Sequence, residues 1–223
     1  MSGPVALKVA LPDGGMVSAL LDASPGARAC YVFAHGAGAG MHHAFMASIA
    51  SGLAERGIAT LRFQFPYMEQ GSKRPDSPKV AHAAVRAAVG EAAKRLPELP
   101  LFAGGKSFGG RMTSQAQAAE PLPGVKGLVF VGFPLHAADK PSTERAVHLD
   151  QVQVPMLFLQ GTRDTLAELG LVREVTAQLK QRATLHVVEG ADHSFHVLAR
   201  SGRNDPQVRE ELLDTMAGWM LAL

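Results

Sequence analysis

The sequence predicts an α/β protein with a mostly parallel, twisted sheet and helices on both of its faces. Two observations lead to this fold class. Short apolar runs alternate with longer stretches of helical periodicity along the chain, which is the order that strand–helix–strand units produce. Several runs, such as Cys30–Ala34, are apolar at every position, as expected of strands that are covered on both sides.

The predicted strands begin with a hairpin. In it, Ala6–Leu11 and Val17–Leu21 are joined across the turn sequence Asp13-Gly14-Gly15. Later strands are expected where apolar or β-branched runs are bounded by glycine, proline or polar residues. These strands are Cys30–Ala34, Ile58–Phe65, Leu101–Ala103, Val125–Phe133, Met156–Gln160 and Thr184–Val188.

The predicted helices follow from 3.6-residue periodicity and from the residues at their ends. They are His43–Arg56, which stops at Gly57; Pro78–Leu96, between Pro75 and Pro97; Arg111–Ala119; Glu168–Arg182; and a final helix that Asp205 caps, with Pro206 at its first position. The connection Pro134–Pro155 is too short to fold as a cap domain, so an open site is expected. No internal repeat or low-complexity linker interrupts the chain, and residues 1–223 are predicted to form a single domain.

The composition excludes several classes of function. The net charge is only +2 and the basic residues are scattered, so no nucleic-acid partner is predicted. Cys30 is the only cysteine, which rules out an internal disulfide. Met1–Gly15 lacks the pattern of a secretion signal, and no stretch is long and apolar enough to cross a bilayer. A cytoplasmic protein without membrane association is predicted, and these features favour no particular oligomeric state.

The most informative segment is Gly104-Gly105-Lys106-Ser107-Phe108-Gly109-Gly110, which lies between a short apolar run and a helical stretch. It is a G-x-S-x-G pattern in a strand–turn–helix context, where the serine is held on a strained turn with its hydroxyl exposed. The positions two residues away on each side must lack a bulky Cβ, and Gly105 and Gly109 occupy them. Ser107 is therefore the predicted nucleophile.

A serine nucleophile needs a base, and the base needs an acid that orients it. In a parallel sheet, such groups lie at the carboxyl ends of strands. Asp164 follows the strand Met156–Gln160, and His193 follows the last strand. The order serine, acid, histidine is the one that this strand–turn–helix arrangement uses. The competing acids are Asp150, Glu168 and Asp192, of which the last is adjacent to the histidine and is expected to point elsewhere.

Two backbone N–H groups are expected to bind the oxyanion. One belongs to Phe108, directly after the nucleophile and at the start of a helix. The other is assigned to Ala37 in the glycine-rich loop 35–40, with Gly38 as the alternative donor and as a candidate pocket residue. Tyr67 and His136 follow strand ends and are candidate substrate contacts at the rim of the pocket.

Together, the segments HGAGAG, GKSFGG, QGTRD and GADHSF resemble the α/β-hydrolase superfamily, and most of all its small, capless, dienelactone-hydrolase-like branch. The segment RFQFPY together with GGKSFGGRM is similar to a family that includes hydrolase-like domains of testis-expressed proteins and of a chromatin acetyltransferase complex subunit. The resemblance spans Tyr31 to the last helix. It implies the same three residues, Ser107, Asp164 and His193, as nucleophile, acid and base. Dienelactone hydrolases use cysteine as the nucleophile, so a serine here argues against that particular substrate.

Three other interpretations fit less well. Gly105-Lys106-Ser107 matches the end of a phosphate-binding loop, but Pro100 stands where that motif requires a glycine. The loop Gly36–Gly40 is not a dinucleotide-binding loop, because Met41 occupies the place of its third glycine. Two groups of histidines are candidates for a metal site: His193 with His196, and His42 and His43 near His35. No metal site is predicted, because neither group has a cysteine or carboxylate at the spacing that metal ligands require.

The sequence therefore predicts a serine hydrolase that cleaves an ester or related acyl bond of a small, soluble substrate through an acyl-enzyme, without a cofactor. Thioesters, lactones and amides stay open as substrates. The alternative is a non-catalytic binding module that retains the α/β-hydrolase fold. The presence of all three candidate catalytic residues argues against that alternative.

Overall fold

The structure is a computed structural model that describes residues 3–223. Met1 and Ser2 lie outside the described residues. They belong to the predicted domain 1–223 and to the segment Met1–Gly15, in which no secretion signal is predicted. Eight strands form one sheet in the order β1-β2-β4-β3-β5-β6-β7-β8. The strands are β1 Val5–Ala10, β2 Met16–Asp22, β3 Ala29–Ala34, β4 Ile58–Phe63, β5 Leu101–Lys106, β6 Val125–Val131, β7 Met156–Gly161 and β8 Ala183–Val188.

The sheet is mixed but mostly parallel. β1 and β2 form the antiparallel hairpin that the sequence predicts, and β2 runs antiparallel to β4. From β4 to β8 every neighbouring pair is parallel. The predicted fold class is confirmed, and the carboxyl ends of β3, β5, β6, β7 and β8 all lie at one edge of the sheet.

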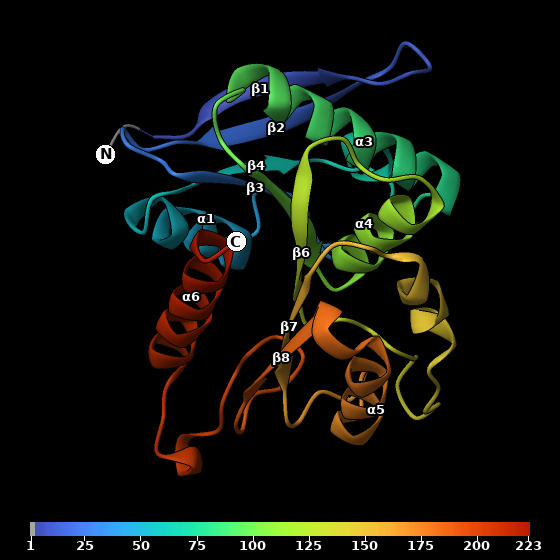
Figure 1. The fold of residues 1–223 in the computed structure, drawn as a ribbon, viewed down its shortest axis with the longest axis vertical. Coiled ribbons are helices and arrows are strands. Elements are labelled where there is room, and N and C mark those ends of the chain that lie inside the picture. The colour runs from blue at the N-terminus through green and yellow to red at the C-terminus, as the bar shows by residue number, and fades with distance from the viewer. Residues whose placement is uncertain (1–2) are drawn as a thin grey trace.

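Helices cover both faces of the sheet (Figure 1). They are α1 Ala44–Glu55, α2 Pro66–Glu69, α3 Pro78–Arg95, α4 Phe108–Ala119, α5 Leu169–Leu179 and α6 Asp205–Leu221, with short 3-10 helices η1 Glu144–Gln151, η2 Lys180–Arg182 and η3 Ala199–Ser201. α1 and α6 bury their apolar side chains against one face, and α3, α4 and α5 cover the other. Among the helices of residues 3–223, none combines the length and the apolar character that crossing a membrane requires.

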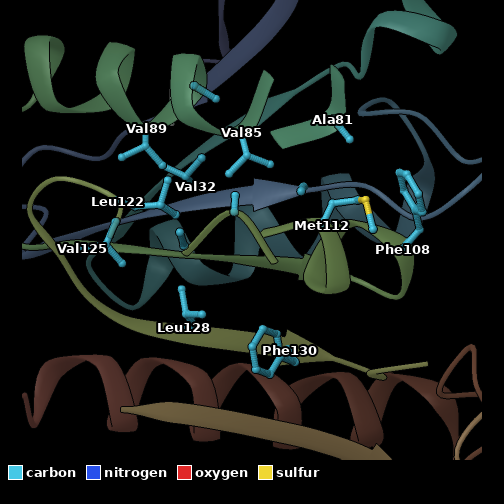
Figure 2. Packing of buried hydrophobic residues seen from close by; sticks show 14 of the residues in the cluster. Val32, Ala81, Val85, Val89, Phe108, Met112, Leu122, Val125, Leu128 and Phe130 are labelled. Atoms are coloured by element: carbon cyan, nitrogen blue, oxygen red, sulfur yellow. The ribbon is translucent and has the colours of Figure 1, made fainter. Parts of the chain in front are cut away.

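Consecutive strand residues point to opposite faces of the sheet and therefore belong to two separate hydrophobic cores. Tyr31 and Phe33 of β3 belong to the cluster beneath α1 and α6, while Val32 of the same strand belongs to the cluster beneath α3 and α4. Figure 2 shows this second cluster, in which Val85 of α3 lies over β3 and Phe108 lies at the end nearest the start of α4. The side chain of Phe108 is therefore part of the core that fixes the beginning of α4.

Several predicted boundaries are wrong. β4 ends at Phe63 rather than Phe65, because Phe65 is the N-cap of the short helix α2. Helix α4 begins at Phe108 rather than Arg111. Asn204, not Asp205, caps α6, in a reciprocal capping box with Gln207. Asp205 is instead the first helical residue, and its carboxylate contacts the His196 ring at 2.8 Å. The irregular connection 134–155 contains the 3-10 helix η1.

Candidate active site

Ser107 stands on a strained turn between β5 and α4. Its backbone has φ 50° and ψ −116°, a conformation that a residue with a side chain adopts only when its surroundings enforce it. A Cβ at Gly105 or at Gly109 would lie 2.4 Å from the carbonyl oxygen of Ala34. Both glycines are therefore required, and the reason is the close approach of the end of β3 as well as the proximity of the two glycines to each other.

Ser107, His193 and Asp164 form a chain of hydrogen bonds although they lie on three different strand exits. The Nδ1 atom of His193 is 2.7 Å from Asp164 Oδ2, and its Nε2 atom is 2.8 Å from Ser107 Oγ. An ionised carboxylate can only accept, so Nδ1 carries the proton and Nε2 accepts from the serine hydroxyl. This tautomer is the one that a general base beside a serine nucleophile needs.

Asp164 is held by more than the histidine. Its side chain is only 1% exposed. Oδ2 also accepts a hydrogen bond of 2.5 Å from Gln160 Nε2, and Oδ1 accepts one of 2.8 Å from the backbone N–H of Leu166. These donors fix the carboxylate in the plane that receives the imidazole N–H, and they stabilise its charged form away from water.

The competing acids lie elsewhere. Asp150 and Glu168 are exposed. Asp192 turns toward its own loop, where its Oδ1 accepts from the backbone N–H groups of Ser194 at 2.8 Å and His196 at 3.0 Å. Of the four acids considered from the sequence, only Asp164 contacts the His193 ring.

The loop after β3 presents backbone N–H groups beside Ser107. The N–H of Gly38 donates to the Tyr67 hydroxyl at 3.1 Å, so it is already occupied. Within residues 3–223, neither the N–H of Ala37 nor that of Phe108 has a protein acceptor. Ala37 lines the same cavity as Ser107, whereas Gly38 does not. Ala37 and Phe108 therefore remain available as backbone donors at this site, and Gly38 does not.

The segment Arg62–Tyr67 braces this loop from behind. Arg62 donates to the carbonyl oxygen of Met41 at 2.9 Å, and Gln64 accepts from the N–H of the same residue at 2.8 Å. The N–H of Phe65 donates to Nε2 of His35 at 3.1 Å, while Nδ1 of that ring donates to the Gly36 carbonyl at 2.8 Å. Burial lowers the pKa of His35 to about 4, so the ring is neutral and can accept at Nε2.

Two of the predicted rim residues are not at the rim. Tyr67 is 2% exposed and its hydroxyl supports Gly38 from the interior, next to the Phe108 ring. His136 is 3% exposed; its Nδ1 donates to the Ala137 carbonyl at 2.8 Å and its Nε2 accepts from the N–H of Glu168 at 3.2 Å. The polar groups of both side chains are hydrogen-bonded to loops, and neither side chain lines the cavity at Ser107.

The cavity at Ser107 has a volume of about 360 Å³. Its walls are mostly apolar side chains together with the polar groups of the site: Gly36, Ala37, Ala39, His43, Phe45, Met46, Lys106, Ser107, Leu166, His193 and Ser194. In the described part of the chain, no group of three or more His, Cys, Asp or Glu side chains is arranged to hold a metal ion.

Sequence reasoning did not predict the supporting contacts of three residues. Gln160 holds Asp164, Tyr67 holds Gly38, and Lys106 contacts the carbonyl oxygen of His193. One signal was available in the sequence. Gln160 and Lys106 are polar residues at the ends of otherwise apolar strands, immediately before functional turns.

Comparison with known protein families matches residues 27–221 to the family described as alpha/beta hydrolase domain. The chain belongs to this alpha/beta hydrolase family. The match begins before β3 and ends at the last residue of α6, so it includes every strand exit that contributes to the candidate site.

Solved structures similar to this alpha/beta hydrolase agree with that fold. A Xanthomonas campestris protein, described as an α/β serine hydrolase without a lid, has a TM-score of 0.74 and 22% identity, covering 98% of this chain and 96% of its own. A dienelactone hydrolase from Anabaena variabilis has a TM-score of 0.80 and 20% identity over 98% and 97% of the two chains. Est1E from Butyrivibrio proteoclasticus, solved with ferulic acid, has a TM-score of 0.70 and 18% identity over 95% and 100%.

Proposed function

We propose that this chain is a serine hydrolase that cleaves an ester or related acyl bond of a small substrate through an acyl-enzyme. The observation that carries the proposal is the chain of hydrogen bonds from Ser107 through His193 to Asp164, at a serine whose backbone is strained. A structural serine in a helix start needs neither that strain nor a buried carboxylate two hydrogen bonds away.

In the proposed reaction, Ser107 Oγ attacks the substrate carbonyl carbon while His193 Nε2 takes the hydroxyl proton. Asp164 stabilises the positive imidazole that results. The negative oxygen of the tetrahedral intermediate is bound by the N–H groups of Phe108 and Ala37. When the bond to the leaving group breaks, that group takes the proton from Nε2. Water then attacks the acyl-enzyme by the same route in reverse, which releases the acid and restores the serine.

The cavity favours a small acyl or aryl group. Its volume of about 360 Å³ lies at the low end of the range for small-molecule sites, and Phe45, Met46 and Leu166 give it apolar walls. The similar Est1E has been solved with ferulic acid, an aromatic acid, bound to it. We propose esters of small aromatic or aliphatic acids as the first substrates to test, and we keep the testis-expressed and chromatin-complex branch as the proposed subfamily.

The decisive experiment is labelling with a fluorophosphonate, which forms a stable bond only with an activated serine. The wild type is expected to react, and Ser107→Ala is expected not to react. Ser51→Ala is the matched control, because Ser51 is exposed on α1 and outside the site. Hydrolysis of short p-nitrophenyl esters by the same three proteins then measures turnover.

A folded wild type that neither labels nor hydrolyses any ester of the panel would contradict the proposal. That outcome would favour the alternative, a binding module that keeps the fold without turnover. Labelling without turnover would show that Ser107 is activated and would place the defect in ester binding or in deacylation.

A further inference from the structure

A partly buried lysine joins the strand of Ser107 to the loop of His193. Lys106 is the last residue of β5, and its Nζ donates to the carbonyl oxygen of His193 at 2.7 Å. Nζ lies 5.7 Å from the centre of the Phe195 ring. It also lies close to Gly132 after β6, where a Cβ would be 3.1 Å from it. The ammonium group is therefore enclosed by three separate segments.

Packing alone does not explain a lysine at this position. Across residues 3–223 the salt bridges of the structure do not include Lys106, so its charge is partly buried without a carboxylate in contact. Burial lowers the pKa of Lys106 to about 8, and the charges of Asp164 and Asp192 oppose this shift. A methionine would fill similar space without the cost of desolvating a charge.

The loop of His193 has few other ties to the serine side of the site. Within the loop, Asp192 accepts from two backbone N–H groups, and the carbonyl of Ala191 accepts from Arg163 on the β7 side at 2.9 Å. Phe195 has a φ of 63°, a left-handed backbone conformation that is unfavourable for a residue with a side chain and is held by its surroundings. The Lys106 bond crosses from this loop to β5.

We infer that Lys106 is a positioning residue, which holds the His193 loop against the end of β5 so that the imidazole stays in contact with Ser107. The inference rests on the proposed hydrolase function. The lysine anchors the backbone of the residue that bears the base, and the next residue in the sequence, directly after β5, is the nucleophile itself. A single side chain thereby sets the separation of the two reacting groups.

The test compares Lys106→Met with wild type on a p-nitrophenyl ester that the wild type hydrolyses. We expect kcat to fall about 100-fold, the loss that a displacement of about 1 Å between reacting groups can cause, with KM close to the wild-type value. Lys126→Met, at an exposed position on β6, is the control and should behave as wild type.

A second variant separates positioning from loss of the fold. In Lys106→Cys, alkylation with 2-bromoethylamine restores an amine at nearly the length of lysine, and Cys30 is fully buried and so protected from the reagent. The amine should recover most of kcat, whereas alkylation with iodoacetamide, which adds no charge, should recover less.

Three results would overturn the inference: wild-type kcat in Lys106→Met, a rise in KM at unchanged kcat, or equal recovery with both alkylating reagents. The second of these would make Lys106 a substrate-binding group instead. An inactive wild type would contradict the proposed hydrolase function itself, so the two failures are distinguishable.

Discussion

Replacement of Asp164 by asparagine tests whether the carboxylate controls the tautomer of His193. The two oxygens of Asp164 accept three hydrogen bonds, from His193 and Gln160 on Oδ2 and from the Leu166 N–H on Oδ1. An asparagine has one oxygen and one NH₂ group, so it cannot accept on both sides. Its oxygen can stay on the Leu166 N–H, in which case its NH₂ group faces the imidazole.

The rest of the site can adapt to that orientation, which makes the variant informative. The Oε1 atom of Gln160 is buried and has no hydrogen-bond partner within the described residues. A flip of the Gln160 amide would present this oxygen to the new NH₂ group. The variant should therefore fold, but His193 would have to accept at Nδ1 and carry its proton on Nε2, facing Ser107. That tautomer cannot take the serine proton.

The expected loss follows from the tautomer. A serine enzyme whose histidine is held in the wrong tautomer loses about 10⁴-fold in kcat, which corresponds to about 5.5 kcal/mol of transition-state stabilisation. The assay is kcat/KM on a p-nitrophenyl ester, together with the rate of fluorophosphonate labelling and thermal unfolding. Asp150→Asn and Glu168→Gln, at the two exposed competing acids, are the controls. Activity of Asp164→Asn within tenfold of wild type, at equal stability, would refute the reasoning.

Three further predictions follow from the same contacts. Gly109→Ala places a Cβ 2.4 Å from a backbone oxygen and should lower the free energy of unfolding, measured by urea denaturation, by about 3 kcal/mol. Gly90→Ala is the control: its Cβ would have no atom within 4 Å, and the substitution should raise the free energy of unfolding by up to about 1 kcal/mol. An unchanged free energy of unfolding in Gly109→Ala would contradict the geometry. Tyr67→Phe leaves the Gly38 N–H without its acceptor and should lower kcat about tenfold with little change in KM; an unchanged kcat would show that the loop needs no such support. Because the pKa of His35 is lowered to about 4, its imidazole takes up a proton between pH 6.5 and 4 in the unfolded chain but not in the folded chain. The free energy of unfolding is therefore highest above about pH 6.5 and falls toward pH 4 by up to about 1.4 kcal/mol per pH unit. His35→Gln should flatten this decline in urea titrations, and the same decline in variant and wild type would count against the prediction.

The strand exits could be predicted from the sequence because their physical causes are local. Runs of apolar residues end at glycine, proline or polar residues, and this places Ser107, Asp164 and His193 at strand ends before any coordinates are known. Gly105 and Gly109 were assigned correctly as positions without room for a side chain, since the turn itself demands them.

The partners of these residues could not be predicted in the same way. That Gln160 donates to Asp164, or Lys106 to the carbonyl of His193, depends on how strands distant in the sequence are placed side by side. Tyr67 and His136 illustrate the opposite error. Both follow strand ends, yet the loops after β3 and β7 take up their polar groups, and neither reaches the cavity. Position at a strand end is therefore not sufficient to make a residue part of the site.

The motif Arg62–Tyr67 shows what the family resemblance does and does not imply. Its polar contacts include those to the loop that carries Ala37, from behind, and none of its residues lines the cavity. A relative that shares this motif therefore shares the support of a backbone donor, which any acyl substrate would require. For the proposed hydrolase we expect substrate choice to depend instead on the cavity wall, which includes His43, Phe45 and Leu166. Exchange of these wall residues, not of the motif, should therefore change the preferred ester.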